Sequence, residues 1–166
     1  MATLEQIYEI ESPLEKGFKD LLEAQSLTVR MPVTYVEDDQ ESDDTQSEDN
    51  ASGVVAIEVQ MGGNVEHGHP TQVAGQNTDD TYNGTLVCTV ISDRGQNVST
   101  HRNRIASVRV ALMSMDITAF NTAQSYHDLL MLQEGASAHE LDDQNNLDLT
   151  RLTFNFIAQV KNSVWP

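Results

Sequence analysis

The stretch NGTLVCTVISDRGQNVSTHRNRIASVRVALM, residues 83–113, decides the fold class because it passes from a strand through a polar turn into a helix. Thr85–Ile91 is an almost unbroken run of β-branched and apolar residues, which is typical of a strand covered on both faces. A helix is predicted to begin near Ser99, because its hydroxyl or that of Thr100 can cap a first-turn N–H group. Apolar residues then recur at three- and four-residue steps and form one stripe: Ile105, Val108, Leu112 and Met113. The stretch therefore predicts a strand packed against an amphipathic helix.

Two further elements are predicted before this stretch. The sequence Ser12-Pro13-Leu14-Glu15 has the form of a capping box with proline at the first helical position, and it predicts a helix over Pro13–Ala24. Apolar and polar residues alternate over Leu27–Tyr35, which is the two-residue period of a strand with one buried face. Pro32 has no amide hydrogen to donate, so we expect this strand to lie at a sheet edge or to break there.

Three more strands are predicted from alternation and apolar runs. They are Val54–Met61, with Glu58 and Gln60 on the polar face, Tyr126–Leu132 and Leu147–Val160. In the last strand the apolar positions change parity near Thr150, which suggests either a bulge or a strand that leaves one sheet environment for another at that point. The segment DITAFNTAQS, residues 116–125, favours neither helix nor strand.

The element order predicts one α+β domain over residues 1–166. We expect a mixed or antiparallel sheet of about four to six strands, packed by the amphipathic helix, with a second helix at the N-terminus. Residues 37–52 carry dense like charge and only Ala51 as an apolar residue, so they are predicted to form a flexible acidic insertion. Residues 62–84 are polar and contain glycine, and they are predicted to form a long loop.

Charge is the strongest compositional deviation, with 26 Asp and Glu residues, 9 Lys and Arg residues and a formal net charge of −17. Such a surface repels nucleic-acid phosphates and anionic membranes. Between Met31 and Asp93 there is no Lys or Arg, whereas four arginines follow closely and are the candidate intersubunit residues: Arg94, Arg102, Arg104 and Arg109. Either copies of the protein attract each other head to tail through these two regions, or the acidic run and the arginines form ordinary solvated surfaces.

The candidate chemical sites do not combine into a catalytic or metal centre. Glu66, His67 and His69 could bind a transition metal, but no third firmly spaced ligand accompanies the two histidines. His101 and His127 could act as general bases, although no motif places a nucleophile beside either of them. Cys88, the single cysteine, lies inside a predicted strand and is expected to be a buried, inert thiol. No phosphate-binding or dinucleotide motif is present, so the sequence predicts no enzyme, no cofactor and no metal.

The resemblance to a known family is concentrated in GTLVCTVIS (84–92), HRNRIASVRVAL (101–112) and LTRLTFNFIAQV (149–160). These segments and the order of elements resemble the tail terminator, or tail completion, proteins of long-tailed bacteriophages, which have no catalytic residues. The resemblance implies a virion structural protein that forms a homo-oligomeric ring, a hexamer in the family, at the head-proximal end of the tail. Its implied partners are the tail tube protein, the head connector or neck protein and genomic DNA that passes through without specific binding.

The resemblance further implies assembly in the host cytoplasm and location in the virion tail or neck. No run of about 18 apolar residues and no leader sequence occurs, so we expect no membrane association. The acidic insertion and the loop with His67 and His69 depart from the family pattern, and they leave another neck, head-completion or tail tube protein open. The net charge leaves a different class open as well, an acidic DNA mimic that inhibits a nucleic-acid enzyme.

Overall fold

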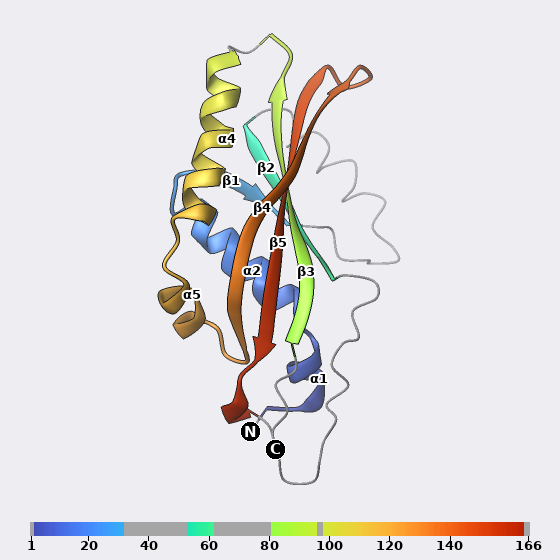
Figure 1. Cartoon of the computed structure of the whole chain (residues 1–166). Coiled ribbons are helices and arrows are strands. Elements are labelled where there is room, and N and C mark those ends of the chain that lie inside the picture. The colour runs from blue at the N-terminus through green and yellow to red at the C-terminus, as the bar shows by residue number, and fades with distance from the viewer. Residues whose placement is uncertain (1, 32–52, 62–80, 96–97, 165–166) are drawn as a thin grey trace.

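The fold is built on a five-stranded mixed sheet with the strand order β1-β2-β3-β5-β4 (Figure 1). The computed structural model describes residues 2–31, 53–61, 81–95 and 98–164. The strands are β1 (Thr28–Arg30), β2 (Val54–Met61), β3 (Thr81–Asp93), β4 (His127–Asp142) and β5 (Leu147–Val160). β1 runs parallel to β2, and all other neighbouring strands are antiparallel. The predicted α+β class with a mixed sheet is therefore confirmed.

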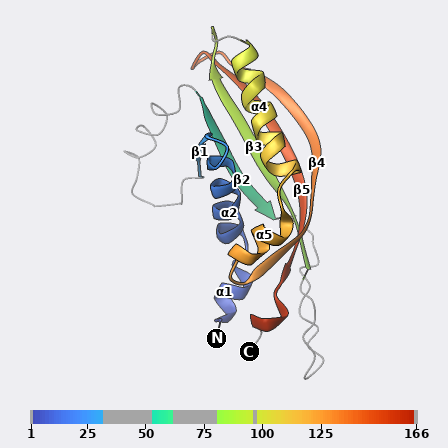
Figure 2. The same ribbon diagram turned by 90° about the vertical axis from the view of Figure 1, so that its left-hand side faces the viewer.

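The described helices all lie on one face of this sheet (Figure 2). They are α1 (Leu4–Tyr8), α2 (Glu11–Glu23), α4 (Val98–Met113) and α5 (Ile117–Ala123), and a short 3-10 helix, η1 (Asn162–Val164), follows β5. α2 packs against β1 and β2, whereas α4 packs against β3 and β4. The expected burial of the central strand on both faces was wrong, because Thr85, Val87 and Thr89 of β3 point to the face without helices and stay half-buried.

The core lies between the helix layer and the sheet. Phe18 of α2 is fully buried, stacks on Phe120 of α5 with ring centroids 5.2 Å apart and lies 6.3 Å from the ring of Phe156. The predicted inward face of β5 is confirmed, since all of its members are buried: Leu152, Phe154, Phe156, Ala158 and Val160. Burial of the large side chains of this core, at about 1.5–3 kcal/mol for each Val, Leu or Phe, is the main stabilising contribution to the fold.

The bulge expected near Thr150 was wrong. The pairing of β5 with β3 runs without a shift from Leu147 to Gln159, and Thr150 continues the inward parity because its hydroxyl bonds to a buried histidine. The irregularities lie instead in β4, between Leu129 and Met131 and between Glu134 and Ser137. The extra residues therefore sit on the edge strand, where they disrupt only one ladder.

Several predicted helix boundaries differ from the structure. α2 begins at Glu11, with Ile10 as the N-cap, so the expected capping box at Ser12 was wrong. α1 was not predicted, although Thr3 and Gln6 form a capping box at its start. Residues 117–123 of the undecided segment are helical, as α5.

The predicted stripe of α4 is correct only in part. Val108 and Leu112 are buried and Ile105 is half-buried, but Met113 is 43% exposed. His101 and Ala111 are buried on this helix in its place. The side of α4 that packs on the sheet thus includes His101 and Ala111 instead of Met113. A prediction from large apolar residues alone therefore misplaced the buried side of the helix.

Two predicted strand boundaries also differ. β3 begins at Thr81, so residues 81–84 of the expected loop are strand, and β4 continues to Asp142 rather than ending at Leu132. β1 lies at a sheet edge as predicted, although its described part is only three residues long. Pro32, the acidic insertion 37–52 and the remaining loop residues 62–80 lie outside the described residues.

Candidate intersubunit surface

Strand β4 forms the edge of the sheet, and within the described residues β5 is its only strand neighbour. Apart from Leu132 and Glu134, which are half-buried, residues 130–141 are exposed. The exposed residues include Leu130 at 49% and Leu141 at 55% of their surface. A long edge with exposed apolar side chains is suited to pairing with another chain.

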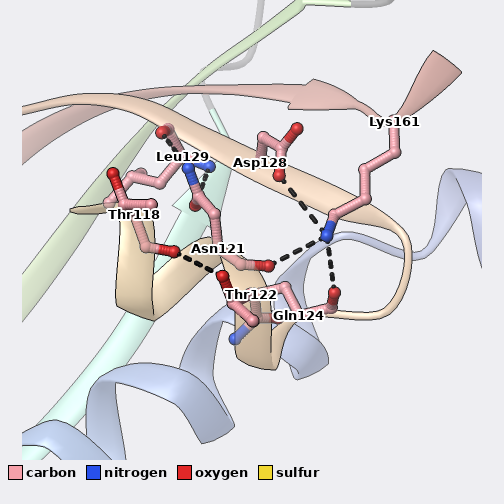
Figure 3. A network of polar contacts seen from close by, with 7 residues as sticks. All are labelled: Thr118, Asn121, Thr122, Gln124, Asp128, Leu129 and Lys161. Atoms are coloured by element: carbon pink, nitrogen blue, oxygen red, sulfur yellow. Dashed lines mark hydrogen bonds and ion pairs between the residues drawn. The ribbon is translucent and has the colours of Figure 1, made fainter. Parts of the chain in front are cut away.

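The beginning of this edge is closed by helix α5 (Figure 3). The Asn121 side chain accepts a hydrogen bond from Leu129 N at 2.7 Å and donates one to Leu129 O at 2.9 Å. Lys161 holds α5 in place, because its Nζ donates to the carbonyls of Asn121 and Gln124 at 2.9 and 2.8 Å. The same Nζ lies 3.5 Å from Asp128 Oδ1. The exposed part of the edge therefore starts directly after Leu129.

At the other end of the sheet, the acidic helix α2 covers β1 and β2. Glu15 of α2 accepts a hydrogen bond at 3.1 Å from the backbone N–H of Val59 in β2. Burial raises the pKa of Glu15, and the bond to Val59 opposes this effect. Glu11, Lys19 and Glu23 are spaced by four residues from Glu15 or from each other and so share its side of the helix. We call Glu11, Glu15, Lys19 and Glu23 the α2 stripe.

Helix α4, beside β4, carries the opposite charge. Its sequence contains three arginines and no acidic residue. Arg109 Nε lies 2.6 Å from Glu134 Oε1, so this side of α4 faces β4. Arg102 is seven residues earlier, hence on the same side, and within the described chain no hydrogen bond or ion pair involves its exposed side chain.

Two exposed apolar residues extend this basic side. Val110 and Met113 of α4 expose 55% and 43% of their surface. Met113 is one helical turn beyond Arg109, and because α4 and β4 run in opposite directions it lies toward the Leu130 end of β4. We call Arg102, Arg109, Val110, Met113 and residues 130–141 the β4–α4 surface.

The other two candidate arginines are directed toward their own chain. Arg94 forms an ion pair with Asp143 in the β4–β5 turn, and its backbone N–H donates to Asn146 O at 2.9 Å. Arg104 Nη1 donates to Ser92 Oγ at 3.0 Å, and its guanidinium lies against Gly53. Arg102 and Arg109 thus share the exposed side of α4 beside β4, where Arg109 is paired with Glu134, whereas Arg94 and Arg104 contact the β4–β5 turn, Ser92 and Gly53. An intersubunit role for the four arginines remains a prediction.

His101 is a buried structural residue rather than an exposed base. Its Nδ1 is 2.6 Å from Ser92 Oγ, and its Nε2 is 2.8 Å from Thr150 Oγ1. Burial lowers the pKa of His101, which favours the neutral ring. Ser92 is only 1% exposed, although it lines a cavity together with His101, His139 and Asp148. The cluster joins α4 to β3 and β5, a role that the sequence pattern did not reveal.

His127 has a similar role at the other end of the molecule. It is fully buried, and its Nε2 donates to Ile7 O of α1 at 2.7 Å. Burial is the largest influence and lowers the pKa of His127. The ring therefore fastens the N-terminal helix to β4, and the adjacent Asp128 instead pairs with Lys161.

The remaining candidate groups are Cys88 and the possible metal ligands Glu66, His67 and His69. Cys88 is buried, and burial raises the pKa of its thiol to about 12, as expected of an inert thiol. Glu66, His67 and His69 lie outside the described residues, and the described residues contain no group of three or more potential metal ligands of the His, Cys, Asp or Glu type. No helix in the described part of the chain is long and apolar enough to cross a membrane.

The fold has a counterpart among solved structures. A chain from the virion of a native gene transfer agent particle superposes with a TM-score of 0.53 at 16% sequence identity. The match covers 88% of this chain and 94% of that chain, and at this identity it concerns the fold. Two structures from Akkermansia muciniphila also match. The match to the first covers 87% of this chain and 74% of that chain, and the match to the second, which lacks its transmembrane region, covers 95% and 96%. Their TM-scores of 0.35 and 0.34, at 10% and 11% identity, carry no weight here. No protein-family model and no curated protein matches the sequence.

Proposed function

We propose that this chain is a virion structural protein that forms a homo-oligomeric ring at the head-proximal end of a phage tail. It caps the tail tube and joins it to the head connector. The observation that carries the proposal is the fold shared with a chain of a gene transfer agent virion over nearly the whole length of both chains.

The described surface supports a role in assembly. The β4–α4 surface presents an unpaired strand edge, exposed apolar side chains and unshared positive charge, which are features of a contact region between proteins. The buried histidines join elements of the fold through their hydrogen bonds. The acidic excess would allow genomic DNA to pass through the ring without binding to its wall.

The test is the location of the protein in particles. A tagged full-length chain, imaged by electron microscopy with a tag-specific label, should appear as a single ring between head connector and tail tube. Particles carrying the tag on a known tube protein provide the control. Label along the whole tail would convert the proposal to a tube protein, and label on the head side alone would favour another neck or head-completion protein.

The acidic DNA mimic is the alternative from a different class, and the net charge of −17 supports it. It predicts that the protein is absent from particles and binds a nuclease or polymerase tightly at low salt. High salt should abolish that binding, since it screens charge over a few ångströms. This pair of results would replace the virion proposal.

A further inference from the structure

We infer that the β4–α4 surface of one copy binds the α2 stripe of a second copy, so that identical chains join head to tail. The inference deepens the proposed ring function and rests on it for its biological setting. It names the two surfaces in contact and the partner, which is another copy of this chain.

The two sides of the sheet differ in a way that suits such a contact. At the β1–β2 end of the sheet, α2 covers the two strands, and the Glu15 carboxylate accepts a hydrogen bond from the backbone N–H of Val59. On the other side, the edge of β4 is left open beyond Leu129, where the Asn121 cap ends. Figure 2 shows α2 and α4 side by side over these opposite sides of the sheet. A chain with one open side and one covered side can join copies in a single direction.

Charge makes the same pairing favourable. The α2 stripe has three glutamates and one lysine, and Lys19 is already paired with Glu23 at 3.4 Å. The exposed side of α4 carries Arg102 and Arg109, and because Arg109 is already paired with Glu134, Arg102 is the α4 charge that would meet the glutamates of a second copy. Opposite charge across an interface speeds encounter and sets the register.

The alternative contact, β4 against β4 of a second copy, is disfavoured by the same charges. A two-fold contact places the same patch of both copies together, and it would bring two basic α4 helices close to each other. A contact between different patches has no such repulsion. Contacts of this kind close into a ring when the rotation between copies closes.

Apolar side chains complete the surface. Leu130, Met131 and Leu141 of β4 and Val110 and Met113 of α4 are all exposed. A second copy seated on this surface would remove these side chains from water, which is favourable. The charges select the partner surface, and apolar burial then holds it.

A charge-swap experiment tests the inference directly. Arg102→Glu places a carboxylate opposite the glutamates of the α2 stripe, and the pair Glu11→Lys and Glu23→Lys places lysines opposite Arg102. At low salt, each variant alone should lose self-association roughly tenfold or more relative to wild type, as measured by analytical ultracentrifugation. An equal mixture of the two variants should recover it, because the substituted position on each surface then meets a group of opposite charge.

Lys16→Glu is the matched control. It changes the net charge as much as Arg102→Glu does, but Lys16 lies outside the α2 stripe, in the groove between α2 and α5. It should self-associate like wild type. Equal loss in Lys16→Glu and Arg102→Glu, or no recovery in the mixture, would contradict the pairing of these two surfaces.

Cysteine cross-linking covers the case in which copies join only within particles. Cys88 is buried with a raised pKa, so cysteines introduced at the surface are the reactive thiols among the described residues. The double variant Leu130→Cys and Glu11→Cys, treated with a short bismaleimide, should give dimers, trimers and larger species. Each single variant should stay monomeric, and a dimer from Leu130→Cys alone would show the two-fold contact and overturn the inference.

Cross-linking is carried out on the free protein and on particles that contain the double variant. No product in either sample would overturn the inferred contact, even if the protein is located in a ring. If cross-linked products form in solution but the protein is absent from particles, the inferred contact is supported and the virion function is rejected. The two failures are therefore distinguishable.

Discussion

Gly84→Ala is predicted to destabilise the protein, although alanine is ordinarily at least as favourable as glycine inside a strand. A Cβ at Gly84 would lie 2.3, 2.7 and 2.9 Å from three ring atoms of Phe156, its direct cross-strand partner. Phe156 is 1% exposed, so its ring has little room to move aside. Overpacking of this kind costs about 1–3 kcal/mol, and the gain from strand propensity is below about 1 kcal/mol. The expected net loss in the free energy of unfolding is about 1–2 kcal/mol.

Urea denaturation followed by circular dichroism measures this loss. Gly135→Ala is the matched control, because Gly135 lies in β4 and an added Cβ would lie 3.1 Å from the exposed Asn155 amide and 3.3 Å from the Thr153 carbonyl, farther than the 2.3 Å at Gly84. We expect it to change stability by no more than about 0.5 kcal/mol. In a double-mutant cycle, Phe156→Leu should relieve most of the cost of Gly84→Ala. A Gly84→Ala protein as stable as wild type, or additive effects in the cycle, would refute the close packing of strand and ring.

Three further predictions concern the helices and the buried histidines. Leu112→Ala should lower the free energy of unfolding by about 2–5 kcal/mol, because it leaves a cavity. Met113→Ala, at an exposed position of the same helix, should lower it by at most about 0.5 kcal/mol. Equal urea midpoints for the two variants would contradict the observed orientation of α4. Lys161→Met removes two hydrogen bonds to carbonyls at the end of α5 and should lower the free energy of unfolding by about 1–3 kcal/mol. Amide exchange should become faster over residues 117–123 and stay unchanged in β3. Equal protection of α5 in the variant and the wild type would refute the anchoring role of Lys161. Burial lowers the pKa of His127 and His101, so below a pH of about 6.5 the unfolded chain binds protons that the folded chain does not, and stability should fall from pH about 7.5 to about 5.5. His127→Gln should flatten this slope, and an unchanged slope would show that His127 does not contribute to it.

Local patterns in the sequence were sufficient to predict which strand residues face the core. The alternation of Val55, Ile57 and Val59 in β2 and the single parity of Leu152 to Val160 in β5 both correspond to buried faces. These signals were reliable because a strand that buries one face must place every second side chain in the core. The mixed α+β class followed from the order of such elements.

The candidate surface could be predicted only in part. The cluster of arginines was visible in the sequence, but their separation into two groups was not. Arg94 meets Asp143 and Arg104 meets Ser92, and these partners are 49 and 12 residues away in the chain. Which arginine remains unpaired depends on contacts that form only when β3, α4 and the β4–β5 hairpin come together.

The sequence by itself determined the elements whose residues must bury one face, because hydrophobic periodicity is a local property. Tertiary structure alone decided that all described helices lie on one face of the sheet, leaving half of β3 less covered than its apolar run predicts. It also decided that Glu15 bonds to β2 rather than capping its own helix, and that Asn121 ends the covered part of β4. A polar side chain takes whichever unpaired backbone group the folded chain brings within reach, and that choice depends on long-range contacts that no local pattern contains.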